Sequence, residues 1–137
     1  MENQETSQQT NQELALGYCL IIEDNIIDQA KIRLIMSDLG YSTIITVDSL
    51  KSSAYFLKKM APGVIIISFH LKDGTNGVDI LNFPGIYQSK LIFVTDNPNE
   101  GLYESVQGKP NVGFLTKPLC LFVTKSTLDL LDLMVVT

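Results

Sequence analysis

Polar residues that could do chemistry follow four separate apolar runs of the sequence. The acid pair Glu23-Asp24 follows the first run, Ser68 and Thr95 end two later runs, and Lys117 follows the last. Single polar residues are common where strands end, but an acid pair, two hydroxyls and a lysine in this arrangement are much less common by chance. The sequence therefore indicates a polar site assembled from these positions.

The chemistry open to Ser68 is limited by its surroundings in the sequence. A serine hydroxyl is a weak nucleophile unless a base activates it. The G-x-S-x-G pattern of many hydrolases is absent, and the spacing of the single histidine, His70, does not place it as a base. We expect the His70 side chain to face solvent, and Asp73 to make an Asp-Gly turn with Gly74. These features disfavour a serine hydrolase, and we expect the chain not to be an enzyme.

The segment that presents Ser68 is an unbroken run of β-branched residues, Val64 to Ile67. Such a run is typical of a central strand that is buried on both faces. A buried strand of a parallel sheet presents its functional groups where it emerges, at the carboxyl edge. Ser68 is therefore expected at that edge.

The rest of the chain alternates between strand and helix patterns, which predicts a parallel sheet with right-handed crossovers. Asn25 is expected to cap the first helix and Asp48 the second. A helix start is also expected at 97–100. The predicted strands are 18–22, 42–47, 64–67, 90–95 and 111–116, and the other predicted helices are about 26–39, 49–60, 75–82 (short) and 120–135. All the polar positions above then share one edge of the sheet.

Composition bounds the class of protein. The 137 residues suit one domain, with 45% hydrophobic and 18% charged residues and a formal net charge of −5. An acidic chain without a basic cluster argues against binding to nucleic acid or to an anionic membrane surface. Apart from the initiator, residues 1–13 contain no apolar side chain, which predicts a disordered tail over 1–15 and a folded domain over 16–137.

The two cysteines and the absence of targeting signals indicate where the protein works. Cys19 and Cys120 lie far apart in apolar surroundings with no C-x-x-C motif, so both are expected to be buried free thiols. Free thiols fit a reducing compartment. Neither a transmembrane stretch nor a signal peptide is evident. We therefore expect a cytoplasmic protein.

Four motifs carry a resemblance to a known family. IIEDN, VIIISFHLKDGTNGVDIL, LIFVTDN and VGFLTKPL occur in this order and resemble the receiver domains of bacterial two-component response regulators, the CheY-like superfamily. The resemblance covers about residues 18–136. It implies an α/β flavodoxin-like (βα)5 sandwich, with a parallel five-stranded sheet in the order 2-1-3-4-5, and a part in phosphorelay signal transduction.

The resemblance also implies roles for individual residues. Glu23 and Asp24 match the acidic pair that holds Mg²⁺, and the backbone carbonyl of His70 matches the main-chain ligand of that ion. Carboxylate and carbonyl oxygens are suitable ligands for such a cation.

Three further positions match the residues that respond to a bound phosphoryl group. Thr95 matches the switch hydroxyl, and Lys117, followed by the cis-prone Pro118, matches the lysine that counters the phosphoryl charge. Phe114 matches the aromatic switch residue, although its spacing alone is more typical of a core position.

Ser68 is the departure from the family pattern, because this position is the phosphate-accepting aspartate in receiver domains. A serine brings no charge to the site, so Mg²⁺ affinity is expected to be weak or absent, and Lys117 is expected to pair with Asp24. We expect a pseudo-receiver that does not accept phosphate. Two alternatives stay open: an ordinary phosphorylatable receiver carrying an introduced Ser68 and, remotely, a flavin-binding protein, although the acidic EDNIID loop repels phosphate.

A receiver without its own output domain must act through another protein. The expected partners are a histidine kinase, a phosphotransfer protein or another signalling protein. The last helix is apolar around much of its circumference, with Leu128, Leu131 and Val135 on one stripe. That stripe is expected to be mostly core, and the surplus apolar residues allow a partner surface or a homodimer.

Overall fold

The computed structural model describes residues 17–97, 100–106 and 108–135. The expected tail over 1–15 and the proline and asparagine at 98–99 of the expected helix start lie outside these residues. Five parallel strands form one sheet in the order β2-β1-β3-β4-β5, which confirms the predicted topology. The strands are β1 (Cys19–Ile22), β2 (Ile44–Val47), β3 (Val64–Ser68), β4 (Lys90–Thr95) and β5 (Val112–Thr116).

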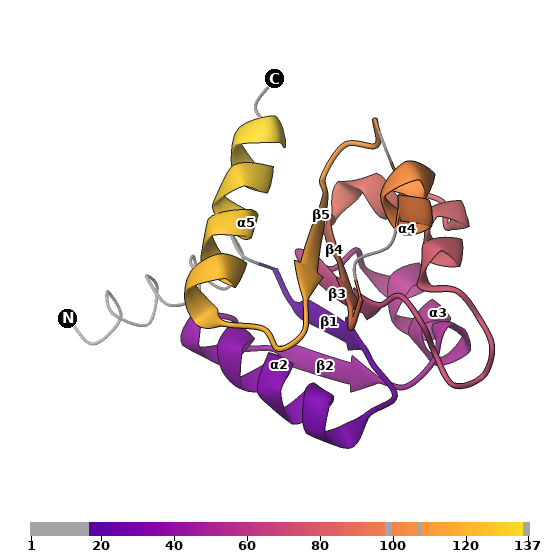
Figure 1. Ribbon diagram of the computed structural model, residues 1–137, viewed down its shortest axis with the longest axis horizontal. Helices are drawn as coiled ribbons and strands as arrows, with labels where there is room; N and C mark the ends of the chain where they lie inside the picture. Colours follow the sequence, from indigo (N-terminus) through magenta and orange to yellow (C-terminus); the bar gives the residue numbers. More distant parts are fainter. Residues whose placement is uncertain (1–16, 98–99, 107, 136–137) are drawn as a thin grey trace.

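Helices cover both faces of the sheet, so the fold has three layers (Figure 1). One face carries α2 and α5, and the other carries α3, two 3₁₀ helices and α4. The bounds are α2 (Ile26–Asp38), α3 (Leu50–Lys59), η1 (Gly77–Asn82), η2 (Ile86–Gln88), α4 (Glu100–Val106) and α5 (Leu121–Val135). The short helix predicted over 75–82 is therefore a 3₁₀ helix.

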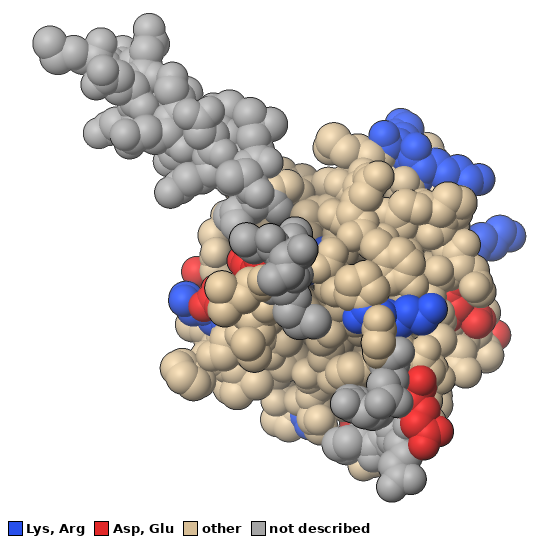
Figure 2. Space-filling model, turned by 90° about the horizontal axis from the view of Figure 1, so that it is seen from above, with Lys and Arg blue, Asp and Glu red and all other residues tan. Residues whose placement is uncertain are grey.

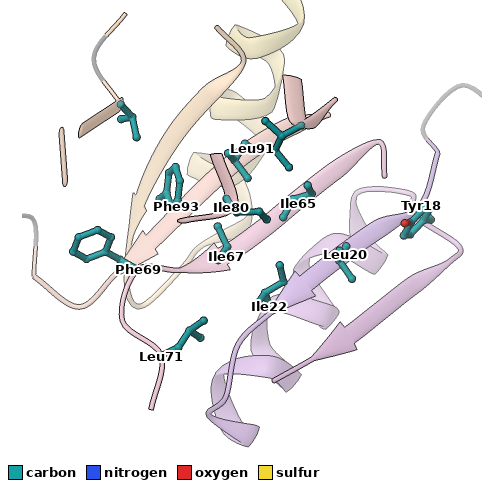
Figure 3. Close-up of a cluster of buried hydrophobic side chains, with 12 residues drawn as sticks. Tyr18, Leu20, Ile22, Ile65, Ile67, Phe69, Leu71, Ile80, Leu91 and Phe93 are labelled. Atoms are coloured by element: carbon teal, nitrogen blue, oxygen red, sulfur yellow. The ribbon is translucent and has the colours of Figure 1, made fainter. Parts of the chain in front are cut away.

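The central strands are apolar on both sides because alternate side chains point to opposite faces. Leu20, Ile65 and Phe93 from three neighbouring strands point to the same side of the sheet (Figure 3). Ile21 and Ile66 belong to the cluster on the opposite side. All five side chains are fully buried, and this sets β1, β3 and β4 rigidly in the middle of the molecule.

Helix starts follow the expected capping chemistry with one difference. The Asn25 side chain accepts a hydrogen bond from the Asp28 amide at 3.0 Å, which confirms it as the cap of α2. The cap of α3 is Ser49, whose hydroxyl accepts from the Ser52 amide at 3.1 Å, and not Asp48. A serine is as good a cap as an aspartate, so composition alone could not choose between the two neighbours.

The two cysteines differ in burial. Both are free thiols, as predicted, but Cys19 is buried in β1 whereas Cys120 is exposed just before α5. The expectation that both are buried was therefore wrong for Cys120. An apolar neighbourhood in the sequence does not fix the side on which a residue at a helix start faces.

In the face shown in Figure 2, Lys, Arg, Asp and Glu side chains are scattered among mainly uncharged residues. Among the described residues, no helix has both the length and the apolar character needed to cross a membrane.

Candidate functional site

The polar residues singled out in the sequence meet at the carboxyl edge of the sheet. They line one cavity of about 210 Å³, which is bounded by Glu23, Asp24, Asp28, Ser68, Thr95 and Lys117, among others. The side chains arrive from the ends of β1, β3, β4 and β5 and from the start of α2, because parallel strands all emerge at this edge. The structure therefore brings together the positions that the sequence predicted to form a site.

Ser68 ends β3 and is buried. Its hydroxyl donates a hydrogen bond to the backbone carbonyl of His70 at 3.1 Å. The His70 side chain is exposed, as predicted from the sequence. The Ser68 hydroxyl is thus hydrogen-bonded to the loop that follows its own strand, and the His70 side chain does not serve it as a base.

The loop after Ser68 is held by a turn and by a close backbone approach. Asp73 accepts hydrogen bonds from the amide and the hydroxyl of Thr75, which confirms the expected turn. These hydrogen bonds lower the pKa of Asp73. Gly77 donates its amide to the Phe69 carbonyl at 2.8 Å. A Cβ at Gly77 would lie 2.5 Å from the Ser68 carbonyl oxygen, so only glycine allows the loop to return this closely.

Lys117 forms the main ion pairs of the site, and its partners differ from the expected one. Its Nζ lies 2.6 Å from Glu23 Oε1 and 2.8 Å from Asp28 Oδ2. Among the described residues, these two carboxylates are its ion-pair partners, and the pair expected with Asp24 is not formed. Asp24 instead accepts a hydrogen bond from the Lys72 backbone amide.

Burial and pairing act in opposite directions on Lys117. Burial alone would lower the pKa of its ammonium group, but the hydrogen bonds to Asp28 and Glu23 and the charges of those carboxylates outweigh it, and the pKa is raised. The lysine therefore stays charged. Its side chain is 13% exposed and that of Glu23 is 2% exposed, so the pair is shielded from most solvent.

The position of Glu23 bears on whether these residues fit Mg²⁺. One Glu23 oxygen pairs with Lys117, and the other accepts the backbone amides of Asp24 at 2.9 Å and Asn25 at 3.2 Å. The His70 carbonyl, the third implied ligand, accepts the Ser68 hydroxyl. In the described part of the chain, no group of three or more acidic, histidine or cysteine side chains is placed to hold a metal. The ligand oxygens of Glu23 and His70 are thus already engaged by groups of the chain itself.

The two switch positions lie in the neighbouring strands β4 and β5. Thr95 ends β4 and is buried, and its hydroxyl donates to the Asn97 carbonyl at 2.9 Å. Phe114 lies in β5, is partly buried and stacks on Phe93 with ring centroids 6.1 Å apart. The Lys117–Pro118 peptide is cis. Thr95 faces the cavity, whereas Phe114 packs against the core on the face of the sheet that carries α3.

The sequence interpretation missed the role of Asp28. Asp28 lies in the first turn of α2, where a carboxylate is favourable for the helix itself. The structure shows that the same side chain also reaches Lys117, which lies 89 positions away. The position of Asp28 one turn from the acid pair was a usable signal, because the start of the helix must lie at the same edge of the sheet.

Comparisons with known proteins identify the fold of this chain. No family model and no curated protein matches the chain. Among solved structures, it is similar to a CheY-like receiver domain from Methylobacillus flagellatus, with 19% identity over 85% of this chain and 98% of that one and a TM-score of 0.69. It is also similar to the receiver domain of a LuxO repressor protein from Vibrio parahaemolyticus, with 22% identity over 88% and 93% of the two chains and a TM-score of 0.72.

A third similar structure is the chemotaxis response regulator CheY4 of Vibrio cholerae, with 17% identity over 85% of this chain and 98% of that one and a TM-score of 0.70. At these identities the likeness concerns the fold. The sheet order and the arrangement of the helices agree with it throughout. The chain therefore has the flavodoxin-like fold of CheY-like response regulator receiver domains.

Proposed function

We propose that this chain is a signalling module with a receiver fold that acts through protein–protein contacts and does not accept phosphate at residue 68. The observation that carries the proposal is the state of the site. Ser68, a neutral hydroxyl, stands at the end of β3 and donates to His70, while Lys117 is held by Glu23 and Asp28. A receiver domain would need a carboxylate at residue 68 to attack a phosphoryl donor.

The proposal extends to the metal. Because the Glu23 carboxylate is already bound to Lys117 and to two backbone amides, Mg²⁺ would have to displace these partners. We therefore expect binding of Mg²⁺ to be weak or absent. The protein is then not an enzyme, and its cellular role is that of a cytoplasmic, bacterial pseudo-receiver.

Phosphorylation by a small-molecule donor tests the proposal. Wild-type protein is incubated with acetyl phosphate and Mg²⁺, and its intact mass is measured alongside that of Ser68→Asp. We expect no added phosphoryl group on the wild type. Uptake of a phosphoryl group by the wild type would contradict the proposal, whereas Mg²⁺-dependent uptake by Ser68→Asp alone would favour the alternative of an ordinary receiver with an introduced serine. Flavin absorbance of the purified protein would revive the remote alternative.

Partner contacts through the last helix form the second part of the proposal. The outer side of α5 exposes Phe122 at 78%, Leu130 at 61% and Leu133 at 69%. Its inner side buries Leu128 and Leu131, as expected, whereas the side chain at 135 lies outside the described ones. Exposed apolar side chains on one helix favour contact with another protein, including a kinase, a phosphotransfer protein or a second copy of this chain.

The helix surface can be tested with a matched pair of substitutions. Phe122→Ser should reduce self-association or partner binding, measured by light scattering after size exclusion. Ile26→Ser is the control, because Ile26 is 79% exposed but lies on α2. An equal effect of the two substitutions would argue against a specific surface on α5.

A further inference from the structure

The ion pair between Lys117 and Asp28 joins parts of the chain that are far apart in sequence. Asp28 lies in the first turn of α2, and Lys117 follows β5. Their side chains meet at 2.8 Å and are 27% and 13% exposed. A charged hydrogen bond in such a shielded place is stronger than one at the surface, so this contact ties the β5–α5 connection to the start of α2.

A lysine ammonium that is withdrawn from water needs carboxylate partners, because an unpaired buried charge is strongly unfavourable. Ser68 lies at the end of the central strand β3 and lines the same cavity. It offers only a neutral hydroxyl, which donates to the His70 carbonyl. Glu23 supplies one carboxylate and divides its charge among Lys117 and two backbone amides. Asp28 is the second carboxylate in contact with the lysine.

We propose that Asp28 is a positioning residue that supplies the counter-charge for Lys117 which residue 68 does not provide. The proposal rests on the proposed function, because it takes the neutral residue 68 as the working state of the protein. Lys117 is thereby held toward α2. Glu23, Lys117 and Asp28 together form an ion-pair network centred on the lysine.

The charge balance makes a specific prediction about a carboxylate at residue 68. The cavity is already lined by the four acidic residues Glu23, Asp24, Asp28 and Asp96 and by the two lysines Lys72 and Lys117. Ser68→Asp adds a further negative charge next to them, and like charges at close range are unfavourable. Removing the charge of Asp28 in that background should relieve the repulsion and release Lys117 to pair with the new carboxylate.

The first measurement follows the Lys117 ammonium itself. Its side-chain ¹H–¹⁵N signal in solution reports how well hydrogen bonds protect it from exchange with water. In Asp28→Asn we expect exchange to become about tenfold faster, since one of two charge-assisted hydrogen bonds loses its charge. Asp28→Glu should restore much of the protection, because it returns a carboxylate.

A matched control separates this effect from a general loss of charge. Asp129 pairs with Lys125 at 3.1 Å on the surface of α5, with both side chains more than 60% exposed. Asp129→Asn should leave the Lys117 signal unchanged and shift the thermal midpoint by less than about 1 °C, as expected for an exposed pair. An unchanged Lys117 signal in Asp28→Asn would overturn the proposal.

The second measurement is a cycle of thermal midpoints with wild type, Asp28→Asn, Ser68→Asp and the double variant. Alone, Asp28→Asn should lower the midpoint by about 4 °C. In the Ser68→Asp background it should leave the midpoint unchanged or raise it, and the Lys117 signal should regain protection. A purely additive cycle would overturn the proposal. Phosphate uptake by the wild type would instead contradict the proposed function and leave these outcomes unaffected.

Discussion

The two faces of the sheet are covered in different ways. One face packs under two long helices, α2 and α5, whereas the other packs under α3, the short α4 and two 3₁₀ helices. In the described part of the chain, each face has twelve buried apolar or cysteine residues. Ten partly buried hydrophobic residues pack against the cluster under α3, α4 and the 3₁₀ helices, whereas four pack against the cluster under α2 and α5. The face under short elements therefore depends more on side chains that remain half in water.

A cavity marks the more loosely covered face. It has a volume of about 250 Å³ and lies between the end of α3 and the turn into η2, against Leu57, Pro62, Phe83 and Ile86. 3₁₀ helices have poorer hydrogen-bond geometry than α-helices and seldom extend beyond a few residues. Short elements can shift more easily when a neighbour changes. The comparison thus predicts that the same substitution is tolerated better on this face than on the face under α2 and α5.

The sharpest test substitutes two neighbouring isoleucines of β3. Ile65 and Ile66 are both fully buried, but Ile65 points to the face with the 3₁₀ helices and Ile66 to the face with α2 and α5. We expect Ile66→Ala to lower the free energy of unfolding by about 4 kcal/mol and Ile65→Ala by about 3 kcal/mol, because the cost depends on how far the surroundings can relax. Urea denaturation measures both losses. Equal losses, or a larger loss at Ile65, would contradict the comparison.

Most of the fold could be predicted from the sequence because its signals are local and strong. The β-branched run at Val64 to Ile67 and the alternation of strands and helices were sufficient for a parallel sheet, and the resemblance to receiver domains implied its strand order. Details that depend on the direction of single side chains could not be predicted. In α3, Phe56 packs against the core while partly exposed, and the buried residue of the helix is the polar Ser53.

The same distinction applies to the functional site, whose location could be predicted but whose ion pairs could not. The common location of Glu23, Ser68, Thr95 and Lys117 follows from topology alone, since parallel strands end at one edge. The choice of partner for Lys117 depends on which carboxylate lies within about 3 Å, and a sequence does not contain that distance. Asp28 was therefore missed, although its helix was correctly placed.

Two glycines provide a milder test of the same comparison. A Cβ at Gly77, the first residue of η1, would lie 2.5 Å from the backbone oxygen of Ser68, which cannot move without shifting β3. A Cβ at Gly113, under α5, would meet a side-chain methyl of Thr127 at 2.8 Å. We expect Gly77→Ala to cost about 2–3 kcal/mol of unfolding free energy and Gly113→Ala about 1 kcal/mol.

The two glycines are expected to reverse the order predicted for the two isoleucines. Because a Cβ at Gly77 would meet backbone, Gly77→Ala should cost more stability than Gly113→Ala, although Gly77 belongs to the face with the 3₁₀ helices. Plasticity on this face would then belong to the packing around Ile65 and not to the loop that returns to Ser68. Thermal or urea denaturation of both variants decides the point. A Gly77→Ala loss no greater than that of Gly113→Ala would show that the loop near the site is also able to adjust.

The smallest predicted effect concerns pH and the tighter face. Burial raises the pKa of Cys19 to about 12 from 9.0, with a small opposing influence of Arg33, and raises that of Tyr41 to about 12 from 10.0. Both residues belong to the cluster under α2 and α5. The folded state keeps these protons at a pH where the unfolded chain has released them. Stability is therefore complete below about pH 8 and declines as pH rises through 9 and above.

Cys19 makes the largest contribution between pH 9 and 10, because the unfolded thiol titrates around 9.0, whereas Tyr18, Tyr41 and Lys117 start from 10.0 or above. We expect the loss of the Cys19 proton in the unfolded chain to lower the free energy of unfolding by about 1 kcal/mol across this window. Urea titrations at pH 8, 9 and 10 measure the slope, and Cys19→Ala should remove most of it. If the slope were absent from the wild type, or unchanged in Cys19→Ala, water would have to reach the thiol in the native state. The face under the two long helices would then be no drier than the face under the 3₁₀ helices.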